Sequence, residues 1–177
     1  MMNLKMTIRR ASTDDIHLIN RLARDIFPAT YRHIISDEQI EYMMEWMYSE
    51  ESLRRQMSEE GHVYLIGEST AGEGELQEKR PFGYVSIEQQ GADLFHLQKI
   101  YVLPNCQGSG AGRYLFQSAI GFIKTVHPTP CVMELNVNRY NPALGFYQHM
   151  GMKVARQGDF DIGNGYFMND YIMSIQL

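Results

Sequence analysis

The sequence has few cysteines, no long apolar run and no excess of basic residues, and each shortage excludes a class of protein. Its two cysteines, Cys106 and Cys131, are too few for a disulfide framework, and no Cys/His cluster indicates a metal site. No stretch approaches the ~20 apolar residues that span a bilayer, and residues 1–10 lack the apolar segment of a secretion signal. The formal net charge of −5 argues against a general nucleic-acid binder. We therefore expect a cytoplasmic protein without a metal, a membrane or a nucleic-acid partner.

What the sequence does contain is typical of one globular domain. Hydrophobic residues make up 44% and charged residues 21% of the 177 residues, and neither a linker nor a repeat divides the chain. A single domain over residues 1–177 is therefore expected. Between Ser36 and Glu60 there are eight carboxylates against Arg54 and Arg55. The ordinary interpretation is a solvated helix face, and the alternative is a field that attracts a cationic substrate.

The spacing of apolar residues predicts the order of the elements. Helices are expected over residues 16–26, where Phe27-Pro28 should end the first one, and over 36–47, 50–58, 110–125 and 142–150. Strands are expected over 6–10, 62–67, 82–88, 93–102, 131–137, 152–157 and 166–175, with the polar stretch 68–80 as a hairpin loop. This order predicts an α/β (α+β) fold with a central, twisted, mixed sheet and helices on both faces. The pattern alone does not name a function.

A glycine-rich turn lies where a long strand gives way to an amphipathic helix. It reads Gln107-Gly108-Ser109-Gly110-Ala111-Gly112, followed by Arg113. Glycine lets the backbone approach an anion closely, and a helix N-terminus offers unpaired N–H groups to phosphate oxygens. Dinucleotide folds use G-x-G-x-x-G instead, with an acidic residue ~20 residues further on, which is missing here. The turn therefore predicts a pyrophosphate site, and a flexible loop that allows tight helix packing is the alternative.

A second motif begins at the end of the next predicted strand, and together with the glycine turn it identifies the family that the sequence resembles. It reads Asn136-x-Asn138-x-x-Asn141-x-Ala143-x-x-Phe146-Tyr147-x-x-x-Gly151-Met152. The two segments resemble motif A of the GNAT acetyltransferase superfamily, written R/Q-x-x-G-x-G/A, and the motif N-x-x-A-x-x-x-Y-x-x-x-G-F that follows it. Gln107 stands where Arg is commoner, and Met152 stands where Phe is usual. The strand order also fits, so the resemblance covers the whole chain and implies a GNAT-like fold that transfers acetyl groups from acetyl-CoA to amines.

The resemblance assigns roles on the donor side. The backbone of Ile100, Tyr101 and Val102 is expected to bind the pantetheine arm and to polarise the thioester carbonyl. Pyrophosphate should lie on Gln107, Gly108, Ser109, Gly110, Ala111, Gly112 and Arg113, and the pantetheine amide should bond to Asn141. Tyr147 resembles the general acid of the family, because a phenol of pKa near 10 can protonate a departing thiolate of pKa ~8.5. Packing in the core beside Phe146 is the alternative for Tyr147.

The general base is the least defined part of this expectation. An alkyl amine has a pKa near 10.4, so almost all of it is protonated at neutral pH. Many members of the family use a Glu on the long strand, and the matching positions here are His96 and Gln98, which share a strand face. His96 titrates near neutral pH and is the predicted base. There are three alternatives. His96 could be purely structural, Glu88 or Glu134 could be the base, or a chain of water molecules could remove the proton.

The two ends of the chain supply the expected acceptor site. Residues 158–173, with Phe27-x-x-x-Tyr31 near the N-terminus, resemble bacterial spermidine/spermine acetyltransferases, which implies a small cationic amine with polyamines first. Aromatic rings and carboxylates suit such a cation, although each candidate could instead be structural. The candidates are Tyr31, Glu38, Glu41, Tyr166, Asp170 and Tyr171.

The mechanism and the rival functions follow from the same residues. Direct attack in a ternary complex is expected, because Cys106 is uncorroborated as an acyl carrier. A peptide or protein amine could be the acceptor instead, or the chain could be a non-catalytic acetyl-CoA-binding module. A kinase or dehydrogenase would need a lysine or acidic partner that the turn lacks. Members of the family are often dimers, so the resemblance also allows a homodimer.

Overall fold

The computed structural model of the protein describes residues 5–71 and 78–177, and within these residues one seven-stranded sheet forms its centre. The strand order is β1-β2-β3-β4-β5-β7-β6, and neighbours are antiparallel except for β4 and β5, which run parallel. The strands are β1 (Lys5–Arg10), β2 (Val63–Ala71), β3 (Glu78–Gly91), β4 (Leu94–Val102), β5 (Val132–Asn138), β6 (Lys153–Gly163) and β7 (Tyr166–Gln176). The predicted mixed sheet is therefore confirmed.

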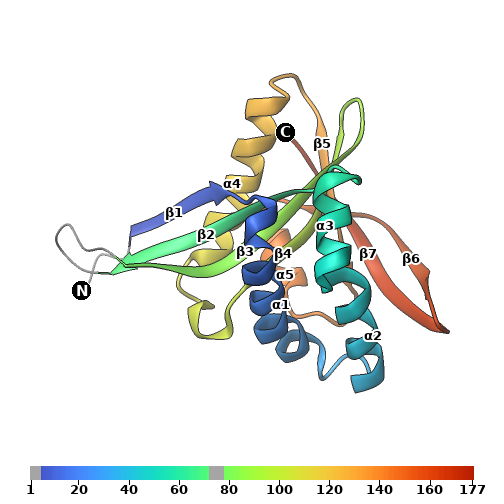
Figure 1. The fold of residues 1–177 in the computed structure, drawn as a ribbon. Helices are drawn as coiled ribbons and strands as arrows, with labels where there is room; N and C mark the ends of the chain where they lie inside the picture. The colour runs from blue at the N-terminus through green and yellow to red at the C-terminus, as the bar shows by residue number, and fades with distance from the viewer. Residues whose placement is uncertain (1–4, 72–77) are drawn as a thin grey trace.

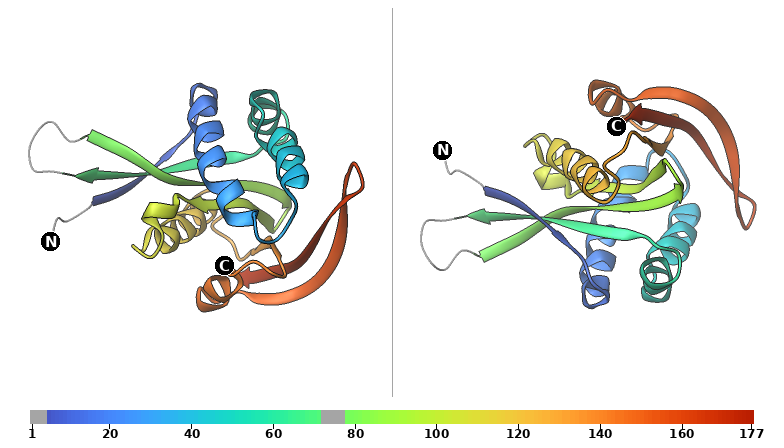
Figure 2. Two further views of the ribbon diagram at one scale, coloured as in Figure 1. Left: turned by 90° about the horizontal axis from the view of Figure 1, so that it is seen from below. Right: turned by 90° about the horizontal axis from the view of Figure 1, so that it is seen from above.

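Helices cover both faces of this sheet. Helices α1 (Ile16–Tyr31), α2 (Asp37–Tyr48) and α3 (Glu50–Ser58) lie on one face, and α4 (Ala111–Val126) lies on the other (Figure 1). The short helix α5 (Leu144–His149) joins β5 to the last hairpin, and two 3-10 turns, η1 (Thr13–Asp15) and η2 (Pro104–Cys106), precede α1 and α4. The hairpin of β6 and β7 arches away from the rest of the sheet, as both views in Figure 2 show.

Each face of the sheet has its own core. On the α4 face, the helix buries an aliphatic and aromatic stripe against β3, β4 and β5, and its members are Leu115, Phe116, Ala119 and Ile123. On the other face, α1 buries the stripe predicted from its 3.6-residue period, which includes Ile16, Ile19, Leu22, Ala23 and Ile26. Burying one large apolar side chain stabilises the fold by about 1.5–3 kcal/mol.

Serine caps set the helix starts. Ser12 Oγ accepts from the N–H of Asp14, while the N–H of Ser12 donates to Asp15 Oδ2, so the turn before α1 is a capping box. Ser36 Oγ accepts from the N–H of Gln39 at the start of α2. These caps confirm the helix starts predicted after Ser12 and at Ser36.

The prediction that the first helix ends at Phe27-Pro28 is wrong. Helix α1 continues through Pro28 to Tyr31, although proline inside a helix costs about 3 kcal/mol. The last turn is held by burial, because the rings of Phe27 and Tyr31 lie 4.4 Å apart in the core and both side chains are buried. Thr30 Oγ1 also donates to the carbonyl of Ile26 within this turn.

The strands are longer than predicted at both hairpins. The expected loop over 68–80 is strand on both sides, because β2 reaches Ala71 and β3 begins at Glu78, and residues 72–77 lie outside the described residues. Ion pairs explain why this polar stretch can stay extended, since Glu68 contacts Arg9 on β1 and Lys79 on β3. Strand β6 likewise reaches Gly163 instead of ending near residue 157.

Candidate active site

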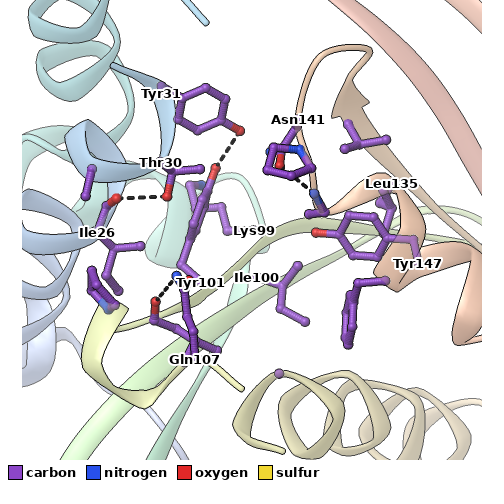
Figure 3. Close-up of a pocket in the computed structure, with 18 of the residues that line it drawn as sticks. Ile26, Thr30, Tyr31, Lys99, Ile100, Tyr101, Gln107, Leu135, Asn141 and Tyr147 are labelled. Atoms are coloured by element: carbon purple, nitrogen blue, oxygen red, sulfur yellow. Dashed lines mark hydrogen bonds between the residues drawn. The ribbon is translucent and has the colours of Figure 1, made fainter. Parts of the chain in front are cut away.

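A gap between the parallel strands β4 and β5 forms the centre of the site. The two strands pair only over Leu94–Val132, Phe95–Met133 and His96–Glu134, after which β5 pairs with β7 alone. The β5 side of β4 from residue 97 to 102 is therefore an open edge whose N–H and C=O groups have no ladder partner there. A cavity of about 810 Å³ occupies this gap (Figure 3), and β4 from Leu97 to Val102 forms one wall.

A bulge in β4 sets which side chains face each side of the gap. Ser86 of β3 lies opposite Lys99 and Ile87 lies opposite Leu97, so Gln98 is an extra residue without a partner. As a result, Leu97 and Ile100 belong to the α4 core, whereas Tyr101 packs on the α1–α3 side. The bulge lies within the part of β4 that lines the cavity, just before Ile100, Tyr101 and Val102, whose backbone the family resemblance assigned to the pantetheine arm.

The glycine turn forms one end of the cavity. Gly108 and Gly110 have φ angles of 78° and 91°, and apart from their chain neighbours no described residue comes within 4 Å of the position that a Cβ would occupy at either glycine. These are backbone conformations that glycine adopts without strain. Helix α4 begins at Ala111 with Gly110 as its cap, so the first-turn N–H groups of α4 have no side-chain partner. An open surface with unpaired backbone donors is suited to an anion, as the sequence predicted for this turn.

The predicted pyrophosphate residues are nearly all on the cavity wall. Gln107, Gly108, Gly110, Gly112 and Arg113 line it. Ser109 does not, because its Oγ donates to the carbonyl of Cys106, and Ala111 is buried under the helix. For these two residues only a backbone contact with a ligand fits the structure.

The loop after β5 and helix α5 form the opposite wall. Asn141 Oδ1 accepts from the N–H of Ala143, which starts the turn into α5, and Asn141 lines the cavity. Tyr147 follows one turn later, is 8% exposed, and directs its hydroxyl into the cavity (Figure 3). Burial raises the pKa of the Tyr147 phenol, which keeps its proton in place at neutral pH. That is the protonation state a general acid needs.

Helix α1 supplies a wall that the sequence did not reveal. Tyr31, predicted as an acceptor contact, lines the cavity, and its hydroxyl lies 3.3 Å from that of Tyr101 (Figure 3). The neighbours in the wall are Ile26, Ala29, Thr30, His33 and Ile34. The prediction missed this wall because it ended the first helix at Phe27-Pro28. Phe27 and Tyr31, which are four residues apart and so share a helix face, are the sequence signal that could have predicted the longer helix.

The other predicted acceptor residues do not line the cavity. Glu38 and Glu41 are exposed on α2, Tyr166 packs against Tyr42, and Tyr171 packs on the α4 side of the sheet. Asp170 is buried on β7 and accepts a hydrogen bond from Asn136, which does line the cavity. Of these five residues, the structure therefore brings only Asp170 next to the cavity, and the assigned contacts of the other four stay predictions.

The predicted base His96 is buried beside the gap and does not line the cavity. It lies opposite Glu88 on β3 and Glu134 on β5, and burial lowers the pKa of its imidazole. Glu134 forms two hydrogen bonds of 2.8 Å with Arg156, which lower the pKa of that carboxyl group. Glu88 accepts from Gln98 Nε2 at 2.6 Å. Glu88 and Glu134 therefore already have hydrogen-bond partners, and a catalytic role for either of them or for His96 stays a prediction.

Comparison with known proteins shows which family the protein belongs to. The sequence model of the family described as acetyltransferase (GNAT) domain matches residues 32–161, which is most of the chain. The protein belongs to the GNAT acetyltransferase family. It is thus an acetyltransferase that acts with coenzyme A.

Similar sequences and structures extend over almost the whole length of the protein. It is 29% identical to the uncharacterized N-acetyltransferase YuaI of Bacillus subtilis (strain 168) over 158 residues, or 89% of this chain and 86% of YuaI. The PaiA N-acetyltransferase of Thermoplasma acidophilum, solved in complex with coenzyme A, has a TM-score of 0.74 at 24% identity over 98% of this chain and 99% of its own. The spermidine/spermine N-acetyltransferase SpeG of Vibrio cholerae has a TM-score of 0.67 at 19% identity over 97% and 93%. At these identities, the two structures establish a shared fold.

The length and hydropathy of a helix decide whether it could span a membrane. Within residues 5–71 and 78–177, no helix of this GNAT protein is both long and apolar enough to cross a bilayer.

Proposed function

We propose that this GNAT protein transfers the acetyl group of acetyl-CoA to a primary amine, by direct attack in a ternary complex. The acceptor would be a small cationic amine, with polyamines as the first candidates. The observation that carries the proposal is the single cavity between β4 and β5, which reaches from the glycine turn to Tyr147 and to Tyr31. One space therefore joins the glycine turn, an open strand edge, a buried phenol and the end of α1.

The donor would lie along the open edge of β4. Pyrophosphate would be held by backbone N–H groups from Gly108 to Gly112 at the start of α4, with Arg113 as the nearby cation. The pantetheine arm would pair with β4 as an added strand does, and Asn141 would bond to its amide. Backbone N–H groups next to the bulge at Gln98 would then stabilise the oxyanion that forms on the thioester carbonyl.

The chemistry requires three proton transfers. The acceptor ammonium first gives one proton to a base or to water, and the free amine then attacks the thioester carbon. When the tetrahedral intermediate collapses, the C–S bond breaks and the sulfur takes a proton from the Tyr147 hydroxyl. The second proton on the new amide nitrogen leaves at the same stage and restores the phenol. Net products are the acetylated amine, coenzyme A and one proton released to solvent.

A small cationic acceptor is supported by the side of the cavity away from the glycine turn. Tyr31, Tyr101 and Tyr140 line that side and suit an alkyl ammonium through their ring faces. The similar structures include a spermidine/spermine acetyltransferase, which is consistent with a polyamine. We further propose that the enzyme works in the cytoplasm without a metal, a membrane or a nucleic acid. The homodimer stays a prediction.

Release of coenzyme A over a panel of amines tests this proposal. The panel contains spermidine, spermine, amino acids, aminoglycosides and a lysine-containing peptide, each with acetyl-CoA and the whole protein. Saturable thiol release with spermidine and spermine alone is the expected result. Turnover confined to the peptide would replace the small-amine proposal with protein acetylation. Binding of acetyl-CoA without thiol release for any amine would indicate a non-catalytic module and would overturn the proposal.

A further inference from the structure

The carboxylate of Asp170 is the most unusual polar group beside the cavity. The residue is 4% exposed on β7, and its Oδ2 accepts a hydrogen bond of 3.2 Å from Asn136 Nδ2. Its Oδ1 has no hydrogen-bond partner among the described residues. The cation that acts on it most, Arg139, already forms an ion pair with Asp159. A buried carboxylate without a cationic partner is unfavourable for folding, so its presence calls for a functional reason.

Asn136 connects this carboxylate to the cavity. It lies on β5 in the middle of the sheet, yet its side chain is exposed, because β4 has already diverged from β5 at this level. An ionised carboxylate only accepts hydrogen bonds, so the bond that Asn136 donates to Asp170 fixes the Asn136 amide with its nitrogen toward β7. The carbonyl oxygen of Asn136 is then free to accept a hydrogen bond in the cavity, which Asn136 lines.

The location of this pair separates it from the donor site. Alternate residues of a strand share a face, and Asn136 lies between Leu135 and Val137, which both belong to the α4 core. Asn136 therefore faces α1, where Tyr31 lines the same cavity. Burial raises the pKa of the Tyr31 phenol, and the negative charge of Asp170 adds to this effect. The glycine turn, in contrast, belongs to α4 on the other side of the sheet.

The charges around the cavity indicate what Asn136 and Asp170 could bind. Among the described residues that line the cavity, none is an aspartate or glutamate, whereas Lys99 and Arg113 are both basic. An ammonium group that enters would meet no negative charge on the wall itself. Asp170 is the carboxylate directly behind that wall, one hydrogen bond away from the cavity through Asn136. The field at Asn136 Oδ1 is therefore suited to a cation.

We propose that Asn136 Oδ1 contacts the acceptor nitrogen and that Asp170, by holding this amide and supplying its negative charge, selects a cationic amine. Asn136 is then a specificity-determining contact and Asp170 a positioning residue behind it. This inference rests on the proposed amine acetylation. It names which of the acceptor candidates acts, and it gives Asp170 no role as the base.

Steady-state kinetics of Asp170→Asn and Asn136→Leu test the pair against a matched control. Asp25→Asn removes the same charge from the exposed face of α1, away from the cavity. The acceptor is the best aliphatic amine of the panel, and a neutral aryl amine serves as a second acceptor. We expect each of the first two variants to raise the KM of the cationic amine by about tenfold, as the loss of one charged contact does. The KM of acetyl-CoA should be unchanged, and Asp170→Asn should not raise the KM of the neutral amine.

Other outcomes separate the rival explanations. A fall in kcat with an unchanged acceptor KM would make Asp170 a proton acceptor, and an equal rise in the KM of acetyl-CoA would make the pair merely structural; either result overturns the inference. The inference is also overturned if both variants keep the acceptor KM and the kcat of the unmodified enzyme. Thermal unfolding of each variant shows whether the fold is retained. If the unmodified enzyme acetylates no amine at all, the proposed function fails first and the inference falls with it.

Discussion

The two faces of the sheet are buried by different kinds of side chain. The α4 face is closed by aliphatic and phenylalanine side chains such as Leu115, Phe116 and Ile123. The α1–α3 face contains four buried tyrosines and a buried lysine, which are Tyr31, Tyr48, Tyr64, Tyr84 and Lys99. An apolar core needs only volume and shape, whereas each buried hydroxyl or amine needs a partner.

This difference matches the two halves of the site. The proposed donor half is built from backbone, namely the open edge of β4 and the start of α4, and the apolar core behind it only has to be rigid. The acceptor half is built from side chains, among them Tyr31, Tyr101 and Asn136. Donor binding should therefore depend on backbone conformation, and acceptor binding on individual polar groups. Variants on each side of the sheet can break or sharpen this comparison.

The largest effect is expected where the two halves meet, at Tyr147. Tyr147→Phe removes the hydroxyl that would protonate the sulfur and leaves the ring in its core. Loss of a positioned general acid lowers the rate by about 100-fold or more. The kcat for acetyl transfer should fall by this factor while the affinity for acetyl-CoA, measured by calorimetry, changes little.

Tyr114→Phe is the matched control, because Tyr114 packs on α4 against Phe82 and does not line the cavity. It should keep full activity. An unchanged kcat for Tyr147→Phe would show that Tyr147 is a core tyrosine and that the donor half works without a side-chain acid.

Much of the donor half could be predicted from the sequence, because its signals are local. Gly108 and Gly110 adopt left-handed backbone angles at the predicted turn, and α4 starts one residue after Gly110. Glycine spacing and helix periodicity report such features directly. A local signal failed at Pro28, where burial of Phe27 and Tyr31 outweighed the usual effect of proline on a helix.

The acceptor half could not be predicted in the same way, because its residues meet only through tertiary structure. Asn136 and Asp170 are far apart in sequence and become neighbours through the pairing of β5 with β7. Glu38 and Glu41 looked equally suitable as carboxylates, and the fold places them in solvent on α2. His96 was chosen by its position on the strand, whereas the direction of the cavity wall after it is set by the bulge at Gln98.

A smaller effect is expected from Gly110→Ala, which tests the backbone nature of the donor half. Its φ of 91° is strained for alanine by about 1–2 kcal/mol, and the added methyl group would project into the space that the phosphates should occupy. We expect the KM of acetyl-CoA to rise by about tenfold. The KM of the acceptor amine should not change.

Gly121→Ala provides the control on the same helix. Gly121 lies in the middle of α4 with nothing within 4 Å of its added Cβ, so alanine should stabilise the protein by about 0.5–1 kcal/mol and leave both KM values unchanged. Equal acetyl-CoA affinity of the Gly110→Ala and Gly121→Ala variants would refute a phosphate site at the turn.

The last expected effect concerns stability and belongs to the polar core of the α1–α3 face. Lys99 Nζ donates to Gln56 Oε1 at 2.7 Å, and Tyr64 donates to the same oxygen at 2.6 Å. The Nζ atom also lies 5.7 Å and 5.3 Å from the ring centres of Tyr48 and Tyr64. These contacts do not balance the loss of water, and burial lowers the pKa of Lys99 to about 7.

The sign of the pH effect follows from this lowered pKa. An unfolded lysine keeps its proton up to a pKa of about 10.4, so between about pH 7 and pH 10 the unfolded chain binds more protons than the folded one. Stability should therefore rise with pH across this window, by up to about 1 kcal/mol per pH unit from this group. The full unfavourable term is present below about pH 7, where the folded lysine is charged.

Lys99→Met should remove this slope, because methionine fills a similar volume without a charge and Tyr64 still satisfies Gln56. Urea unfolding at several pH values between about 7 and 10 measures it, with Lys153→Met on exposed β6 as the control. The difference in unfolding free energy between Lys99→Met and the unmodified protein should shrink as pH rises, while that for Lys153→Met stays flat. If the unfolding free energies of all three proteins changed with pH in parallel, Lys99 would keep its proton in the folded protein as it does in water. The two faces of the sheet would then differ in the shape of their side chains and not in the cost of burying a charge.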